Sequence, residues 1–281
     1  MTYLLLSIVS STLISVFMRN SEKYIKNNIA MFLVNYAVCS CLARVFMGDQ
    51  KLLLRETGIG FAIMIGLFSG IMYLLSFELF QYNIQKNGMV LASTFMKLGV
   101  LVPIALAIAV FREKPAVLQI VGFVTAIAAI IVIIGYSPNH KENVDSSGSW
   151  LIILLLISGF TDSLANIYNE QGKAELKNHY LFFTFAAACL LCIVIMIAKK
   201  QRFTVLDAIW GILIGIPNYF ASRCLLYSLE ELPAIIVYPV YNAATILMIS
   251  IIGILIFKEQ LEMKKRWGLV LIIASLVLIN L

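Results

Sequence analysis

Apolar runs of bilayer length, separated by short polar segments, constrain the fold of this 281-residue chain more than any other feature. Runs of roughly 18 or more residues with few charges match the hydrocarbon thickness of a membrane. Such runs form helices, because lipid offers no partners for unpaired backbone groups. Only 13% of the residues are charged, against about 25% in soluble domains. We therefore predict an all-α integral membrane protein with ten transmembrane helices, near residues 2–18, 29–47, 57–80, 88–110, 116–136, 149–169, 179–198, 207–229, 234–256 and 265–281.

The basic residues and the cysteines both have ordinary explanations in such a chain. The formal net charge is +6, and the 21 lysines and arginines are scattered mostly in small groups between the apolar runs. This pattern favours anchoring at the membrane surface over nucleic-acid binding. The five cysteines lie inside apolar runs with no histidine or acid nearby, so neither a metal site nor a cofactor is expected. The sequence has no phosphate-binding loop of the Walker type, so any pumping would draw on a gradient or a partner.

An internal repeat divides the chain into two halves. Residues 111–122 (FREKPAVLQIVG) are echoed by residues 257–268 (FKEQLEMKKRWG), at a shift of 146 positions. Both copies contain phenylalanine, a base, glutamate, a short polar stretch and glycine, followed by a final apolar run. Upstream, two glycine pairs recur at nearly the same shift, Gly66 with Gly70 and Gly211 with Gly215. These matches indicate two related structural units.

Each half contains five of the predicted spans, which determines how the halves are oriented. An odd number of spans inserts the second half upside down with respect to the first, as in transporters built from inverted repeats. We predict a first five-helix repeat at 1–137, a linker loop at 138–148 and a second, inverted five-helix repeat at 149–281. Such repeats enclose a central cavity, and the binding site lies near the middle of the bilayer.

The two junctions also carry a resemblance to a known family. Phe111-Arg112-Glu113 and Phe257-Lys258-Glu259 each place a glutamate at the end of the fourth span of a half, and Gly122 or Gly268 begins the fifth. With Pro103 in the fourth span and the tandem architecture, the chain resembles the ten-helix EamA-type members of the drug/metabolite transporter superfamily. The resemblance implies an alternating-access carrier, with four helices of each half around the cavity. It also implies that the substrate is an amino acid, another metabolite, a nucleotide sugar or an organic cation. The family has no shared catalytic residue that could be carried over to this chain.

The charge distribution and the resemblance give opposite orientations in the membrane. Loops that follow the odd-numbered runs carry 12 lysines and arginines, and the remaining loops carry 7. The positive-inside rule would place the odd-numbered loops in the cytoplasm and the N-terminus outside. The resemblance implies instead that both termini are cytoplasmic. Both orientations stay open at this point, and the expected location is the inner membrane of a bacterial-type cell.

Ionisable residues inside the runs are the strongest indications of function. A charge at a helix centre costs about 2.5–3.5 kcal/mol on insertion scales, so each one retained needs a function or a partner. Asp162 lies in the middle of a polar stripe at helical spacing in the sixth run, with Ser158, Thr161 and Asn166. We predict that Asp162 and Asn166 line the cavity, where Asp162 would bind a cationic group or carry a proton. The alternative is a seam of hydrogen bonds between helices.

Two bases and a second acid lie in other runs. Lys97 is about nine residues from either end of the fourth run, and Arg223 shares a helical face of the eighth run with Tyr219. At these depths both bases, with Tyr219, are candidates to bind a carboxylate or phosphate of the solute. The alternative is a structural salt bridge from either base to Asp162 or Glu78. Glu78 is a second candidate for proton coupling, although its position near the end of the third run favours an interfacial placement.

The ninth run carries a second polar stripe. Tyr238, Tyr241, Asn242 and Thr245 recur at helical spacing, and Pro239 would loosen the backbone beside them. Tyrosine combines an apolar face with a polar tip and suits an amine or aromatic solute. We predict that Tyr238, Tyr241 and Asn242 line the binding site. Packing with satisfied hydroxyl groups is the alternative.

An acid, two bases and tyrosines at one depth favour a solute that bears both charge signs. The leading hypothesis is a secondary active transporter, in the export direction, of a small polar metabolite such as an amino acid. The alternative is a proton-coupled carrier of drugs or quaternary amines, although two bases argue against it. A non-transporting subunit of a membrane complex is a further alternative, and no enzyme is expected because the two histidines lie in loops. The expected partners are the solute, the lipid bilayer and a second copy of the chain.

Overall fold

The computed structural model describes residues 1–25, 27–48, 50–52, 57–102, 116–134, 145–232, 234–260 and 262–279. These residues contain ten α-helices and two short 3-10 helices. These residues include no strand, so the prediction of an all-helical chain is confirmed. The elements are α1 (Thr2–Ser21), α2 (Asn28–Phe46), α3 (Ile59–Asn87), α4 (Met89–Lys97), η1 (Leu98–Val100), α6 (Val117–Ile134), α7 (Asp145–Gln171), η2 (Ala174–Leu176), α8 (Lys177–Ala198), α9 (Val205–Glu231), α10 (Ala234–Leu255) and α11 (Met263–Ile279). Pro103, the junction at 111–113 and residues 138–144 of the predicted linker lie outside the described residues.

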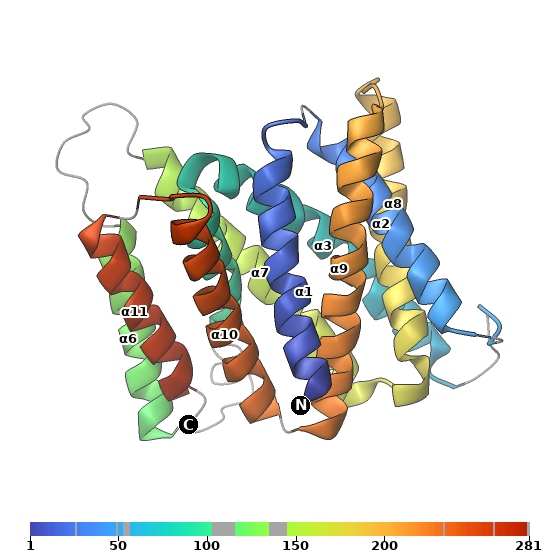
Figure 1. Ribbon diagram of the computed structural model, residues 1–281. Helices are drawn as coiled ribbons and strands as arrows, with labels where there is room; N and C mark the ends of the chain where they lie inside the picture. Colours follow the sequence, from blue (N-terminus) through green and yellow to red (C-terminus); the bar gives the residue numbers. More distant parts are fainter. Residues whose placement is uncertain are drawn as a thin grey trace.

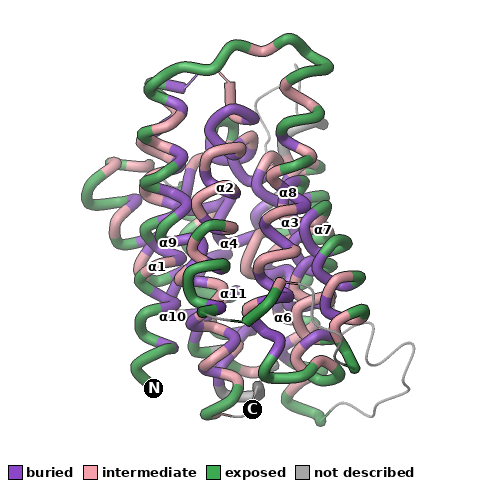
Figure 2. Tube along the Cα trace, turned by 90° about the vertical axis from the view of Figure 1, so that its right-hand side faces the viewer, coloured by how far each residue is buried: buried purple, intermediate pink, exposed green. Residues whose placement is uncertain are grey.

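The helices stand side by side in one bundle and run roughly along a common direction (Figure 1). Six of the described helices are long and apolar enough to cross a membrane, namely α1, α2, α3, α7, α8 and α9. Shorter apolar helices occur within α4 with η1, α6 and α10. Large apolar side chains are exposed on the outside of the bundle, and Val117, Ile197 and Val205 are 77%, 72% and 75% exposed. Figure 2 shows that exposed residues follow the outer surface while buried residues lie inside. Lipid is the solvent that such a surface requires.

The two ends of the bundle are called face 1 and face 2. Face 1, at the top of Figure 1, is the end at which α1 ends and α9 begins. Face 2 is the opposite end, at which α1 begins and α9 ends.

The third helix is longer than the sequence pattern predicts, since α3 continues to Asn87 instead of ending near residue 80. The polar residues that indicated a break find partners within the bundle. Gln81 donates a hydrogen bond to the Met18 carbonyl at 3.2 Å, and Asn83 donates to the Trp150 carbonyl at 3.2 Å. The helix ends at Gly88, whose φ of +84° lies in the region that glycine adopts without strain.

The two glycine pairs identified in the sequence lie at contacts between helices of different halves. Gly66 and Gly70 of α3 lie against α8, and Gly211 and Gly215 of α9 lie against α2. A Cβ atom on Gly70 would lie 2.4 Å from a carbonyl oxygen of α8, and one on Gly215 would lie 2.8 Å from a carbonyl oxygen of α2. Small residues of this kind let the backbones of membrane helices approach closely. The glycines therefore hold α3 to α8 and α9 to α2.

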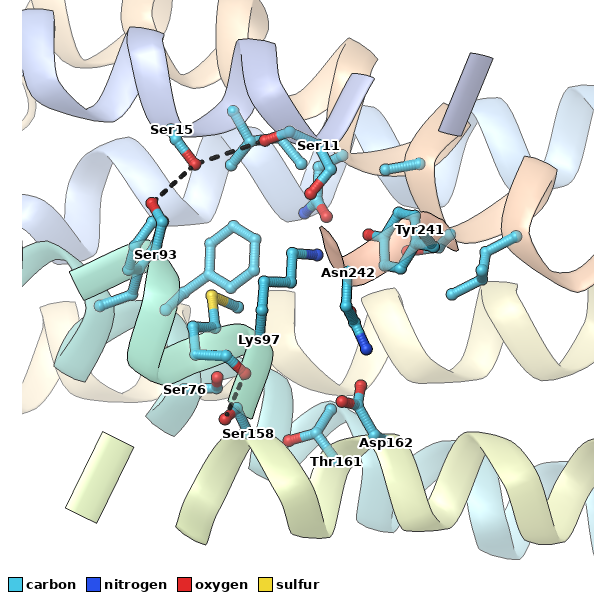
Figure 3. A pocket seen from close by; sticks show the side chains of 18 of the residues that line it. Ser11, Ser15, Ser76, Ser93, Lys97, Ser158, Thr161, Asp162, Tyr241 and Asn242 are labelled. Atoms are coloured by element: carbon cyan, nitrogen blue, oxygen red, sulfur yellow. Dashed lines mark hydrogen bonds between the residues drawn. The ribbon is translucent and has the colours of Figure 1, made fainter. Parts of the chain in front are cut away.

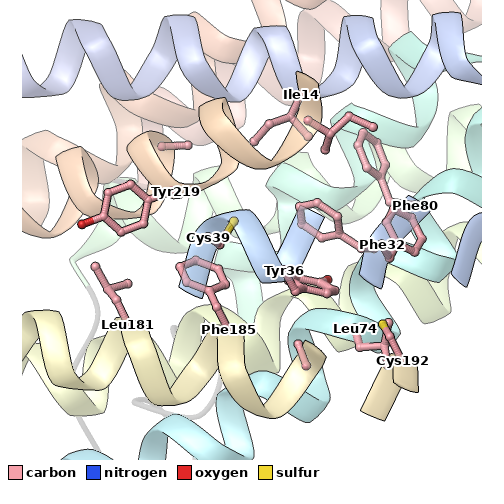
Figure 4. Packing of buried hydrophobic residues seen from close by; sticks show 14 of the residues in the cluster. Ile14, Phe32, Tyr36, Cys39, Leu74, Phe80, Leu181, Phe185, Cys192 and Tyr219 are labelled. Carbon is pink, nitrogen blue, oxygen red and sulfur yellow. The ribbon is translucent and has the colours of Figure 1, made fainter. Parts of the chain in front are cut away.

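Aromatic side chains fill the space between α2, α3, α8 and α9 (Figure 4). Tyr36 of α2 stacks on Phe185 of α8 with ring centroids 6.4 Å apart. Phe32 meets Phe77 of α3 edge-on at 5.9 Å, and Tyr219 of α9 is fully buried in the same cluster. This packed region forms one side of the bundle. Many of the other buried polar residues lie between α1, α3, α4, α7, α9 and α10, where there is a cavity.

Candidate solute-binding site

A cavity of about 90 Å³ lies inside the bundle, enclosed by helices of both predicted halves. Helices α1, α3 and α4 contribute to its wall from the first half, and α7, α9 and α10 from the second. Its lining is rich in neutral polar side chains, which are Ser11, Ser15, Ser76, Ser93, Ser158, Thr161, Asn218, Ser222 and Asn242. Hydrocarbon would exclude so many hydroxyl and amide groups, so this interior suits water or a polar solute.

Lys97 and Asp162 bring opposite charges into this cavity. Lys97 is the last residue of α4, and its ammonium lies 3.9 Å from the centre of the Tyr241 ring of α10. Asp162 enters from α7, and in Figure 3 the amide of Asn242 lies between the lysine and aspartate side chains. The aromatic ring stabilises the ammonium through a cation–π contact. The cavity thus offers a base with an aromatic wall at one point and a carboxylate at another.

No ion pair within 4.0 Å joins Lys97 or Arg223 to Asp162 or Glu78, four residues that the structure describes. The structural salt bridge considered as an alternative is therefore not formed in this conformation. Charges within a membrane are stabilised by partners or by water. Lys97 and Asp162 thus line one cavity without forming an ion pair.

Tyr238 and Asn166 lie next to the charged groups. Tyr238 lines the cavity, and its hydroxyl donates a hydrogen bond to the side-chain oxygen of Asn166. Asn166 is on α7, one turn beyond Asp162, and does not itself line the cavity. The structure thus brings Asp162, Lys97, Tyr238, Tyr241 and Asn242 to one cavity, with Asn166 behind Tyr238.

Arg223 and Tyr219 lie outside the cavity, although both were predicted to contact solute. The guanidinium of Arg223 donates to the side-chain oxygen of Asn178 at 2.6 Å and to the hydroxyls of Tyr219 and Tyr227 at 2.9 and 3.3 Å. It also lies 4.3 Å from the centre of the Phe46 ring. These partners come from α2, α8 and α9, so Arg223 ties these helices together outside the cavity.

Glu78 also lies outside the residues that line the cavity. One of its carboxylate oxygens is buried and has no hydrogen-bond partner among the described residues. Its neighbour two positions earlier, Ser76, does line the cavity. Glu78, for which we predicted a role in proton coupling, therefore does not contact the cavity directly in this conformation.

Several residues that line the cavity were not predicted from the sequence. Ser11 and Ser15 of α1, and Tyr73 and Ser76 of α3, all contribute to its wall. The hydroxyl of Tyr73 lies 3.0 Å from that of Ser222, which links α3 to α9 beside the cavity. The spacing of the two α1 serines, four residues apart, is the signal that could have indicated a polar face on the first helix.

An ionic network at face 1 joins the two predicted halves. Glu259, in the connection between α10 and α11, accepts hydrogen bonds from the backbone nitrogens of Met89 and Val90 at 2.8 and 3.1 Å. These nitrogens belong to the first turn of α4, where a carboxylate is favoured by the helix dipole. Arg19 of α1 lies 3.5 Å from the same carboxylate and also pairs with Glu22. The side chain of Glu259 is only 8% exposed.

Apolar helices around a cavity that is lined by polar and charged side chains define a multi-pass membrane protein. Comparison with known proteins adds a family match. Residues 148–281 match the model of the EamA-like transporter family. The resemblance to the drug/metabolite transporter superfamily is thereby confirmed. The described residues contain no group of three or more His, Cys, Asp or Glu side chains that could hold a metal ion.

Two similar proteins match larger parts of the chain. An uncharacterized protein of Haemophilus influenzae is 23% identical over 187 residues, which are 66% of this chain and 63% of that protein. A protein crystal structure superposes with a TM-score of 0.65 at 11% identity, covering 99% of this chain and 96% of that one. At this identity the match shows the fold alone. The fold therefore extends across both halves of the chain.

Proposed function

We propose that this chain is a secondary active transporter that exports a small zwitterionic metabolite of the amino-acid class across the inner membrane. The observation that carries the proposal is the cavity in which Lys97 and Asp162 lie without pairing. An amino acid presents a carboxylate that suits the ammonium of Lys97 and an ammonium group that suits the carboxylate of Asp162. Asn242, between them, offers both a donor and an acceptor.

Alternating access is the mechanism that we propose for this cavity. In transporters built as two inverted repeats, one unit rocks against the other around a central site. Two features support such an arrangement here: each glycine pair faces a helix of the other half, and Glu259 closes face 1 by binding the N-terminus of α4. In this mechanism the present conformation is closed at face 1, and the solute would leave or enter there when the network around Glu259 opens.

A proton-coupled carrier of organic cations is the second candidate. Five aromatic residues favour it, because Tyr73, Phe77, Phe80, Tyr238 and Tyr241 all line the cavity that contains Asp162. Aromatic faces and a carboxylate attract quaternary amines. The ammonium of Lys97 in the same cavity would repel a solute that carries only positive charge, so the zwitterion is the better match.

Transport by the purified protein in proteoliposomes tests both candidates. The assay would measure efflux of a radiolabelled amino-acid mixture and, separately, of a labelled quaternary amine. We expect amino-acid efflux to fall about 10- to 100-fold in Asp162→Asn and in Lys97→Met, because each variant removes a charge-assisted contact. Lys86→Met is the matched control, since Lys86 is exposed near the end of α3. Unchanged efflux in both cavity variants would refute the proposed site, and efflux of the amine alone would favour the second candidate.

A further inference from the structure

Three serines form one wall of the cavity, which we call the serine wall. Ser15 of α1, Ser76 of α3 and Ser93 of α4 line the cavity and are 3%, 2% and 2% exposed. In Figure 3 all three lie on the opposite side of the Lys97 side chain from Tyr241 and Asp162. The serine wall is therefore separate from the groups that would hold the charges of a zwitterion.

The hydroxyl of Ser76 has no hydrogen-bond partner among the described residues, although it is buried. Buried serine and threonine hydroxyls in this bundle commonly donate to the carbonyl four residues earlier, as Thr12, Ser228 and Ser250 do at 2.8, 2.7 and 2.7 Å. Ser76 departs from this pattern at the surface of a cavity. Since a buried polar group without a partner is unfavourable, the occupant of the cavity is the partner that would satisfy it.

The other two hydroxyls of the serine wall are only loosely engaged. Ser93 donates to the Ser15 hydroxyl at 3.3 Å, and Ser15 donates to the Ser11 carbonyl at 3.4 Å. Hydroxyl hydrogen bonds are usually about 2.7–2.8 Å long. Contacts of this length can be exchanged for shorter ones to a polar group that enters the cavity.

We propose that the serine wall is a subsite for an uncharged, hydrogen-bonding side chain of the solute, and that Ser76 is its specificity-determining residue. This inference rests on the proposed function, because Lys97 and Asp162 hold the two charges of the same solute. The cavity of about 90 Å³ has room for roughly six to nine water molecules. A zwitterion of about seven non-hydrogen atoms, with a hydroxyl on its side chain, fills a comparable space.

Titration calorimetry with two pairs of amino acids tests the subsite. Serine is compared with alanine, and threonine with valine, because each pair differs chiefly in one hydroxyl group. The wild-type protein is expected to bind the hydroxylated member about 3- to 10-fold more tightly. In Ser76→Ala this ratio falls to about 1, while the affinity for alanine stays within about twofold of the wild-type value.

Two further variants keep the test specific. Ser93→Ala, in the same wall, should reduce the ratio in the same direction. Ser250→Ala is the matched control, because Ser250 donates to its own helix outside the cavity, and it should keep the wild-type ratio. A ratio in Ser76→Ala equal to that of the wild type would overturn the subsite and leave the proposed function intact. A wild-type protein that binds none of the four amino acids would overturn both.

Discussion

The carboxylate of Glu259 is the group whose removal most directly tests how face 1 is closed. It accepts hydrogen bonds from the backbone nitrogens of Met89 and Val90 at 2.8 and 3.1 Å, and its side chain is 8% exposed. Hydrogen bonds to charged groups contribute about 1.5–3 kcal/mol each, and a carboxylate at a helix N-terminus adds about 0.3–1 kcal/mol. Glu259→Gln leaves one acceptor for two donors and removes the charge. We expect it to lower the free energy of unfolding by about 2–4 kcal/mol.

Unfolding of the purified protein in mixed micelles, followed by circular dichroism as the denaturing detergent increases, measures this loss. Glu262→Gln is the matched control, because Glu262 is an exposed glutamate in the same connection. Its free energy of unfolding should stay within about 0.5 kcal/mol of the wild type. If Glu259→Gln behaves like this control, the carboxylate does not stabilise the N-terminus of α4, and the account of face 1 is wrong.

Three further predictions concern packing and the cavity. Gly70→Ala should destabilise the protein by about 1–3 kcal/mol in the same assay, because the new Cβ would lie 2.4 Å from a backbone oxygen of α8. Gly60→Ala is its control and should not destabilise the protein, because Gly60 has open space around it. Tyr241→Leu should weaken amino-acid binding about 3- to 30-fold in titration calorimetry through loss of the cation–π contact, and Tyr241→Phe should retain most of the affinity. Arg223→Gln should lower the free energy of unfolding by about 1–3 kcal/mol. It should leave the affinity for amino acids within about twofold of the wild-type value, since Arg223 lies outside the cavity. A large loss of this affinity would place Arg223 in the binding site.

Much of the fold follows from the sequence, because lipid imposes a simple rule on it. A backbone in hydrocarbon must satisfy its own hydrogen bonds, so long apolar runs predict helices directly. The polar stripes were also informative, since Asp162, Tyr238, Tyr241 and Asn242 come from two runs and line one cavity. Periodicity shows which residues share a helical face, and residues that hydrocarbon rejects must face the interior.

The positions of Arg223 and Glu259 could not be predicted in the same way. Periodicity places Arg223 on a face with two tyrosines, yet it does not show whether that face meets the cavity or the contact with α2 and α8. Glu259 was identified only as part of a repeated junction, and its partners Met89 and Val90 are about 170 residues away. The length of α3 was missed for a related reason, because Gln81 finds its partner on another helix. Contacts between distant segments decide all three cases.

Helix α4 connects the closure of face 1 to the base in the cavity. Its first turn is bound by Glu259 and its last residue is Lys97, so the nine residues of α4, about 12 Å from end to end, connect the two. Beyond Lys97 the helix continues as the 3-10 turn η1, a geometry that often marks a hinge within a helix. We therefore expect Glu259→Gln to change amino-acid affinity by about threefold or more, although Glu259 lies outside the cavity, because movement of α4 would displace Lys97 relative to Asp162. Titration calorimetry measures this change, and an affinity equal to that of Glu262→Gln would show that closure of face 1 and solute binding are independent.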